Sequence, residues 1–127
     1  MDLPDLEFGV RSADAGDGVY VVGVRGELDT HTAPELDLEL GDVLARGAAR
    51  LIVDLSGVTF IDSTSVAVIA GAANAMETRS GLLLLVNDRP STAKVLQITG
   101  VDRVVPLRRT LGEALVEAEH GVGRGVA

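Results

Sequence analysis

Residues 51–76 read LIVDLSGVTFIDSTSVAVIAGAANAM, a pattern that predicts a buried strand followed directly by a long helix. The first part, residues 51–55, is a nearly continuous apolar run, which is typical of a strand covered on both faces. From Thr64 to about Ser80 the apolar residues instead recur about every 3.6 positions, as on one side of a helix, and Gly81 stands where such a helix would end. We therefore expect this strand to lie in the middle of the sheet.

A hairpin and a helix are predicted upstream of this stretch. Residues 6–28 contain two runs with strand character, joined by the glycine-rich segment ADAGDG, and predict two antiparallel strands. A helix then begins with Thr32 as N-cap, and Glu35 three residues later completes the pattern of a capping box. Gly47 is predicted to end this helix.

Strands and helices continue to alternate downstream. Residues 82–86, LLLLV, predict a second fully buried strand. A helix is expected from its N-cap Ser91 to Gly100, with Val95, Leu96 and Ile98 on its buried side. A short edge strand in residues 101–107 and an amphipathic helix in residues 110–120 complete the pattern. This order predicts an α/β domain with a mixed sheet and right-handed crossovers.

The length and composition indicate a single domain. With 127 residues, of which 46% are hydrophobic, the chain can build a core without metal or disulfide staples. We expect residues 1–119 to form this domain and residues 120–127 to be a flexible C-terminal tail.

The charge and the residue types exclude several partners. A net charge of −8 and few aromatic rings disfavour binding to a phosphate backbone or to stacked bases, so no nucleic-acid partner is expected. The apolar runs are far shorter than the roughly 20 residues of a membrane span, and the N-terminus is acidic. Together with the absence of cysteine, this predicts a cytoplasmic protein without a membrane partner.

An enzyme of the α/β-hydrolase type is the first alternative, because Ser63 lies at a strand-to-helix turn. That nucleophile elbow requires glycine two residues before and after the serine, where this chain has Ile61 and Ser65. The available bases, His31 and His120, do not follow the usual order of nucleophile, acid and base. Two distant histidines and no cysteine predict no metal site, and the phosphate-binding glycine motifs are absent. We expect no enzymatic activity and no cofactor.

Three hydroxyls and a carboxylate stand together at the start of the central predicted helix, in residues 62–65. Serine is a preferred N-cap residue, because its oxygen accepts an N–H from two or three residues further on, which is worth about 1 kcal/mol. From the residues alone, helix capping is the simplest role of this cluster.

Three separated segments resemble the STAS-domain family, in particular the small bacterial anti-sigma-factor antagonists. They are LIVDLSGVTFIDSTS at the central junction, VRGELDTHTAPEL upstream and LQITGVDRVVPL downstream, and the resemblance covers about residues 6–118. It implies a mixed sheet of four or five strands with about four helices packed on it.

The resemblance also implies roles for individual residues. Ser63 matches the phosphorylation site of the family, which is used by a partner that is both anti-sigma factor and serine kinase, and Thr64 matches the second hydroxyl of the motif. Asp29 lies in a loop expected beside the phosphorylation site. The implied partner-binding surface consists of Asp29, Asp62, Ser63, Thr64 and Ser65. The resemblance further implies that the unphosphorylated protein binds the anti-sigma factor, that the phosphorylated protein does not, and that a phosphatase restores the first form.

Ser65 departs from the family pattern, which usually has glycine after the second hydroxyl. We expect its side chain to add bulk and a third hydroxyl where the backbone of a partner approaches. This departure leaves open which hydroxyl is used. It also keeps open an alternative, a STAS scaffold or transporter-associated subunit that docks a partner without a phosphorylation cycle.

Overall fold

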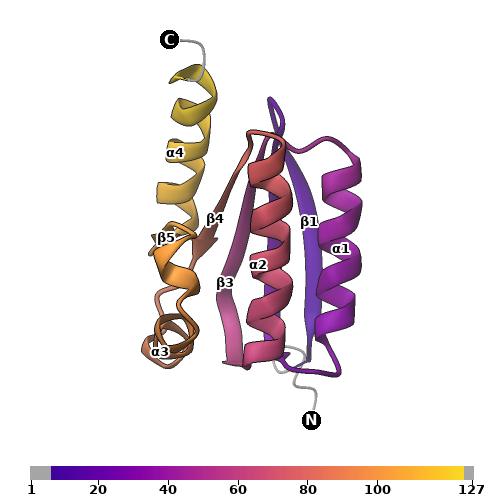
Figure 1. Ribbon diagram of the computed structural model, residues 1–127, viewed down its shortest axis with the longest axis vertical. Helices are drawn as coiled ribbons and strands as arrows, with labels where there is room; N and C mark the ends of the chain where they lie inside the picture. The colour runs from indigo at the N-terminus through magenta and orange to yellow at the C-terminus, as the bar shows by residue number, and fades with distance from the viewer. Residues whose placement is uncertain (1–6, 125–127) are drawn as a thin grey trace.

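A five-stranded sheet with helices on both faces forms the protein, as the computed structural model of residues 7–124 shows, with side chains described to residue 120 (Figure 1). The elements are β1 (Gly9–Gly16), β2 (Val19–Leu28), α1 (Ala33–Ala45), β3 (Arg50–Ile61), α2 (Ser63–Thr78), β4 (Leu82–Val86), α3 (Pro90–Thr99), the 3₁₀ helix η2 (Val101–Arg103), β5 (Leu107–Arg108) and α4 (Leu111–Arg124).

The strands lie in the order β1-β2-β3-β4-β5, which confirms the mixed sheet and places β3 at its centre as predicted. The hairpin of β1 and β2 is antiparallel, and all other neighbours are parallel. Leu28 at the end of β2 pairs with Ile61 at the end of β3. The carboxyl ends of these two strands therefore meet at one edge of the sheet, and α1 and α2 both start there.

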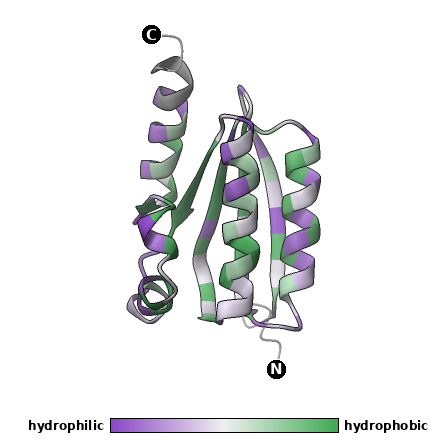
Figure 2. Ribbon diagram, viewed as in Figure 1, coloured by the Kyte–Doolittle hydropathy of each residue, from purple (hydrophilic) through white to green (hydrophobic). Residues whose placement is uncertain are grey.

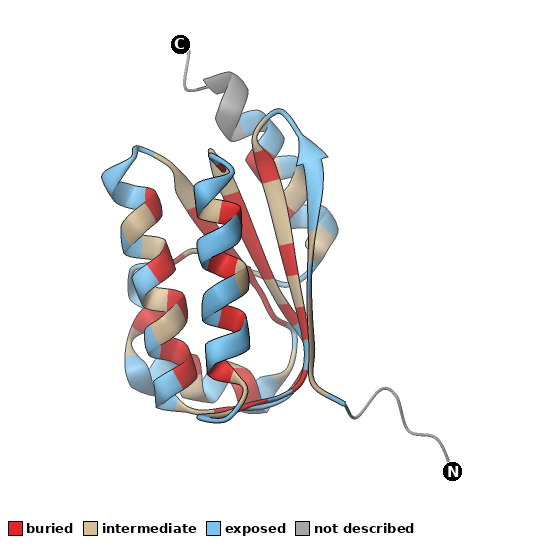
Figure 3. Cartoon of the chain, turned by 90° about the vertical axis from the view of Figure 1, so that its right-hand side faces the viewer, coloured by how far each residue is buried: buried red, intermediate tan, exposed pale blue. Residues whose placement is uncertain are grey.

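Both faces of the sheet are covered, which explains the continuous apolar pattern of β3. Helices α1 and α2 lie side by side on one face, and α4 lies on the other (Figures 1 and 3). Leu51 and Val53 belong to the core under α1 and α2, whereas Ile52 packs with Ala114 and Ala118 of α4. β4 is hydrophobic along its whole length (Figure 2).

Thr32 is the N-cap residue of α1, but the predicted capping box is wrong. The backbone of Thr32 is already helical, with φ −99° and ψ −21°, and its side chain makes no capping hydrogen bond. Its hydroxyl instead donates to the carbonyl oxygen of Glu27 at 2.8 Å and accepts the N–H of Asp29 at 2.9 Å. The helix ends at Ala45, and Gly47 follows it with φ +86°, as expected for a glycine after a helix.

The end of α2 differs from the prediction in its turn residue. The helix ends at Thr78, and Ser80, not Gly81, adopts the left-handed conformation, with φ +61°. Gly81 is required for a different reason. Its N–H donates to the carbonyl of Met76 at 2.7 Å, and a Cβ at this position would lie 2.7 Å from Met76 Cε and 3.0 Å from the carbonyl oxygen of Ala49.

The start and the buried side of α3 also differ from the prediction. Arg89, not Ser91, is the N-cap residue, and it makes no side-chain capping bond. Thr92 and Leu96 are buried, whereas Ile98 is 75% exposed. Thr92 and Leu96 are four residues apart and therefore lie on the same face of the helix, which is the buried face. The sequence pattern did not distinguish this face from the adjacent face that carries Ile98.

The last third of the chain agrees with the prediction in part. Gly100, with φ +81°, ends α3 as expected. The edge strand expected in residues 101–107 is mostly wrong: residues 101–103 form the 3₁₀ helix η2, and the observed edge strand β5 overlaps the expected range only at Leu107. α4 continues to Arg124, beyond residue 119, where the domain was expected to end. Residues 125–127 of the predicted tail lie outside the described residues, and its flexibility stays a prediction. Within residues 7–124, no helix combines the length and apolar character needed to cross a membrane.

Candidate functional site

The carboxylate of Asp62 caps α2, whose first residue is Ser63. The backbone of Asp62 is extended, with φ −120° and ψ 174°, and its Oδ1 accepts the N–H of Ser65 at 2.9 Å. This satisfies one of the N–H groups that have no partner within a helix. The prediction that a serine of this cluster caps the helix is therefore wrong, and Ser63 has no capping role.

Ser63 and Thr64 face the solvent in the first turn of α2. Both residues are exposed, and neither hydroxyl has a hydrogen-bond partner among the described side chains. A group could therefore be added to either hydroxyl without breaking a contact inside the domain.

Ser65 points in the opposite direction, into the domain. Its exposed fraction is 0%, and its hydroxyl lies 2.9 Å from the carbonyl oxygen of Leu28 and 2.9 Å from Oδ1 of Asp62. This corrects the expectation that Ser65 presents a third hydroxyl and extra bulk to a partner. The position of Ser65 on the helix could be predicted from the sequence, whereas its inward direction follows from the contact with the end of β2.

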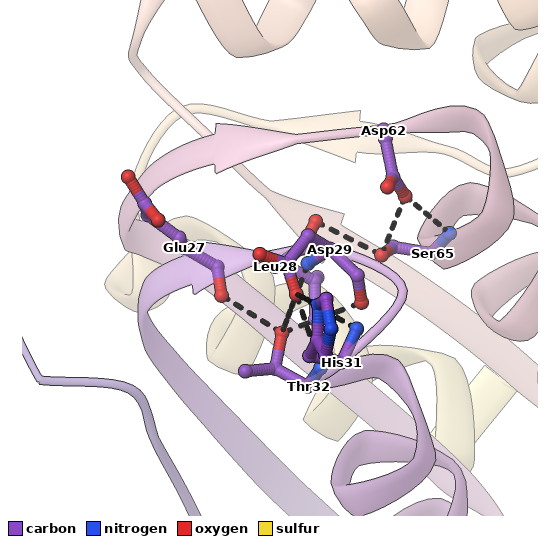
Figure 4. A network of polar contacts seen from close by, with 7 residues as sticks. All are labelled: Glu27, Leu28, Asp29, His31, Thr32, Asp62 and Ser65. Carbon is purple, nitrogen blue, oxygen red and sulfur yellow. Dashed lines mark hydrogen bonds and ion pairs between the residues drawn. The ribbon is translucent and has the colours of Figure 1, made fainter.

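Asp29 forms a tight turn directly after β2. Its Oδ1 accepts the N–H groups of His31 at 2.9 Å and of Thr32 at 3.1 Å (Figure 4). Burial raises the pKa of the Asp29 carboxyl, but the hydrogen bonds from His31 and Thr32, together with the positive charge of a protonated His31, outweigh burial and lower this pKa. Asp29 is therefore ionised at neutral pH.

The carbonyl of Leu28 joins this turn to the start of α2. It accepts the N–H of Asp62 at 3.3 Å, it is also in contact with the hydroxyl of Ser65, and Asp29 is the next residue in the chain. The ends of β2 and β3 thereby bring the turns of Asp29 and Asp62 together beside Ser63, as Figure 4 shows for the two aspartates. This acidic edge with a free hydroxyl is the candidate site.

A groove of about 420 Å³ opens beside Ser63, between α2 and the segment that links α3 to β5. Val104 in its wall is 77% exposed. We call it the Ser63 groove, and it is lined by Ser63, Val66, Ala67, Ala70, Thr99, Gly100, Val101 and Val104. The sequence did not predict it, because its walls come from separate segments. The small residues at positions 67 and 70 were the only signal.

A smaller groove of about 230 Å³ lies on the other side of α2, against α1. Asp37 and Gly41 of α1 line it together with Ala67 and Gly71 of α2, and Ser63 does not. The two grooves leave the outer face of α2 accessible, but only the Ser63 groove contains a candidate site residue.

The histidines do not form a catalytic group with Ser63. The side chain of His31 is 93% exposed, and its Nδ1 lies 4.0 Å from Oδ1 of Asp29. His120 is exposed on α4, a helix on the other face of the sheet. In the described part of the chain, no three His, Asp or Glu side chains are grouped so that they could hold a metal ion.

Comparisons with known proteins agree on one family. The family model that describes the STAS domain matches residues 11–114 of this chain. The chain is 31% identical over 121 residues to the anti-sigma-F factor antagonist RsfB of Mycobacterium tuberculosis, and the match covers 95% of this chain and 97% of RsfB.

Two solved structures extend this result. The crystal structure of an anti-sigma factor antagonist from Mycobacterium paratuberculosis superposes with a TM-score of 0.82 at 34% identity, covering 94% of this chain and 99% of that one. The Bacillus protein SpoIIAA in its phosphorylated form gives a TM-score of 0.68 at 24% identity, covering 86% and 98% of the two chains, a likeness of fold alone. The family model spans both the sheet and the site, and the relatives match over nearly their whole length, so this chain belongs to the STAS domain family.

Proposed function

We propose that this protein is an anti-sigma-factor antagonist that binds a serine-kinase anti-sigma factor while unphosphorylated and is released when that kinase phosphorylates Ser63. The observation that carries the proposal is the exposed hydroxyl of Ser63 at the start of α2, without a partner in the described part of the chain and beside two acidic turns. Relatives that match nearly the whole chain are named anti-sigma factor antagonists, which supports the role.

Burial separates the three hydroxyls of the junction. Ser65 has no exposed surface, so a kinase could modify it only after opening the start of α2. Ser63 and Thr64 are both exposed, but of the two only Ser63 lines the Ser63 groove. Ser63 is also the residue that matches the family's phosphorylation site. We therefore assign Ser63 as the acceptor.

A phosphate on Ser63 should leave the domain folded. The N–H groups and dipole at a helix start favour an exposed anion by about 0.3–1 kcal/mol. Repulsion from Asp62 and Asp29 opposes this, and each pair of unit charges at about 5 Å costs about 1–3 kcal/mol in a solvent-exposed setting. The repulsion exceeds the favourable contribution, but at an exposed site it lies at the low end of this range, so the net cost should stay at about 1–2 kcal/mol, below the about 5–15 kcal/mol stability of an ordinary domain.

The same phosphate acts differently at an interface. A phosphate dianion that is buried against a partner loses its hydration water. The basic side chains of a partner that fits this surface already pair with Asp29 and Asp62, so none is left to pair with the phosphate. A penalty of about 3 kcal/mol weakens binding more than a hundredfold. The switch therefore operates at the binding step and not through unfolding.

The Ser63 groove is the docking surface that fits this role. Apart from Ser63 and Thr99 its lining is apolar, whereas Asp62 and Asp29 lie at the end that holds Ser63. A partner that places an aliphatic side chain in the groove and a basic side chain toward the acidic turns would hold its bound ATP beside Ser63. The groove against α1 offers no such link to the acceptor.

The antagonist itself needs no catalytic activity in this cycle. The kinase partner supplies the phosphoryl group from ATP, and a separate phosphatase removes it. We therefore also propose that the protein acts in the cytoplasm.

The alternative role of a STAS scaffold or transporter-associated subunit loses the observation that favoured it. That observation was Ser65 in place of glycine, and Ser65 is buried and does not alter the exposed surface. Capture from a cell extract of the source organism decides between the two roles. A transporter subunit on the immobilised chain would support the scaffold, and a serine kinase with an ATPase domain would support the antagonist.

Phosphorylation mapping tests the proposal directly. The purified chain is incubated with the captured kinase and ATP, and the modified residue is identified by mass spectrometry. One phosphate on Ser63 is expected, which Ser63→Ala abolishes and Thr64→Ala retains. Modification at Thr64 alone, or no modification of the wild-type chain, would contradict the proposal.

A further inference from the structure

We propose that Ser65 is a positioning residue for Ser63: its buried hydroxyl fixes the carboxylate of Asp62 and ties the start of α2 to the end of β2. The inference rests on the proposed role of Ser63 as acceptor. It assigns a function to a side chain that no partner can touch, because Ser65 is fully buried.

Both donors of Ser65 converge on a single oxygen of Asp62. The N–H and the hydroxyl of Ser65 each lie 2.9 Å from Oδ1, and this carboxylate belongs to the residue directly before Ser63. One hydrogen bond leaves a carboxylate free to rotate about its last torsion, which is broad, whereas two donors from different directions restrain it. The orientation of the charge beside Ser63 therefore depends on the Ser65 hydroxyl.

The same hydroxyl connects α2 to β2. It lies 2.9 Å from the carbonyl oxygen of Leu28, a residue 37 positions away in the chain (Figure 4). A serine hydroxyl has one proton, so it is shared between Leu28 and Asp62, and the oxygen stays within hydrogen-bond distance of both. Leu28 in turn holds the Asp62 N–H and precedes Asp29. Ser65 thus sits between the two acidic turns.

Removal of the hydroxyl should change the presentation of Ser63 while leaving the docking surface intact. In Ser65→Ala the Asp62 carboxylate keeps only the backbone N–H as a donor, so it can turn toward the adjacent Ser63 hydroxyl. Phosphoryl transfer requires the acceptor oxygen in line with ATP, and a displacement of about 1 Å can cost about a hundredfold in rate. Ser65 is not among the residues that line the Ser63 groove, so binding should be preserved.

Steady-state phosphorylation with the captured kinase and ATP measures the effect on phosphoryl transfer, through kcat, separately from the effect on the KM for the chain. For Ser65→Ala we expect kcat to fall about tenfold or more, with KM for the chain within about twofold of wild type. Ser91→Ala is the matched control, because Ser91 is an exposed serine in the first turn of α3. Each variant is assayed well below its melting temperature, so that all chains are folded. A wild-type kcat in folded Ser65→Ala, with only the melting temperature lowered, would reduce Ser65 to a stabilising residue and overturn the proposal.

A measurement without kinase separates this inference from the proposed function. In amide NMR spectra, Ser65→Ala should shift the signals of Asp62 and Asp29, whereas Ser91→Ala should leave both in place. If the wild-type chain is not phosphorylated, the proposed function fails. Shifted signals would then still support the positioning of Asp62 by Ser65, and unmoved signals would overturn it.

Discussion

Val104 and Ile98 expose almost the same fraction of their surface, 77% and 75%, but only Val104 lines the Ser63 groove. This pair separates docking in the groove from general surface hydrophobicity. In Val104→Asp, a partner that fills the groove must bury an unpaired charge, so its affinity should fall about tenfold or more. Ile98→Asp should bind like wild type. Titration calorimetry with the captured kinase measures the affinity of both variants. Equal losses of affinity would show that the groove is not part of the interface.

Ser63→Asp should imitate the phosphorylated form in binding but not in stability. The added charge lies at an exposed helix start, so the free energy of unfolding should change by no more than about 1–2 kcal/mol. Binding to the kinase should weaken, because the interface must desolvate the new carboxylate beside Asp62. Calorimetry and urea unfolding give the two quantities. Ser63→Ala is the control and should bind like wild type, and equal affinities for the Asp and Ala variants would argue against a charge switch.

Asp62→Ala should destabilise the domain, because Asp62 is the cap of α2. Loss of a capping side chain costs about 0.5–2 kcal/mol. The buried hydroxyl of Ser65 keeps its second acceptor, the carbonyl of Leu28, so a larger penalty for an unsatisfied group is not expected. Ser63→Ala should leave stability within about 0.5 kcal/mol of wild type. Urea unfolding that gave the larger loss to Ser63→Ala would identify the serine as the cap after all.

The charge of Asp29 should stabilise the domain at neutral pH and lose this effect in acid. Its pKa is lowered in the folded protein, so folding favours the ionised form. This contribution is present above the unfolded pKa of about 3.9 and disappears as the pH falls through the lowered folded value. Asp29→Asn keeps an oxygen that can accept the N–H groups of His31 and Thr32, and removes only the charge. The melting temperatures of the two proteins should therefore differ at pH 7 and converge toward pH 2. A difference that is constant over this range would contradict the assignment.

Substitution by alanine should change the stability of the domain in opposite directions at Gly81 and at Gly71. A Cβ on Gly81 would lie 2.7 Å from Met76 Cε and 3.0 Å from the carbonyl oxygen of Ala49, so Gly81→Ala should lower stability by about 1–3 kcal/mol. Gly71 lies inside α2 with open space around the same position, so Gly71→Ala should raise stability by about 0.5–1 kcal/mol. Thermal unfolding compares the two variants. An increase in stability in both would contradict the prediction and show that the residues around Gly81 can move to accommodate a methyl group.

The strand-to-helix junction could be predicted from the sequence because its signal is local. The change from a continuous apolar run to a helical period predicted a strand at residues 51–55, which lie within β3, and a helix from Thr64, one residue after α2 begins. The resemblance of the motif supplied the identity of Ser63 as candidate acceptor. Both depend on residues that are neighbours in the chain.

The direction of Ser65 and the Ser63 groove could not be predicted in this way. Ser65 is turned inward by a carbonyl 37 residues earlier in the sequence, and Val104 reaches the groove through the packing of the α3 and η2 segment against α2. The cap of α2 was misassigned because aspartate and serine are both preferred at that position, and only the backbone shows which residue is extended. Contacts between distant segments decided the direction of Ser65 and the groove, whereas the local backbone conformation decided the cap.

The Leu28 carbonyl, held between the Asp62 N–H and the Ser65 hydroxyl, has a consequence for the timing of the proposed cycle. The candidate site lies at the ends of β2 and β3, two core strands whose backbone is already ordered in the unbound protein. We therefore expect that no segment of residues 7–124 folds or rearranges between the two chemical states. In the proposed cycle, the response time is then set by kinase turnover, dissociation of the complex and phosphatase turnover, and the same molecule can serve through many rounds of signalling.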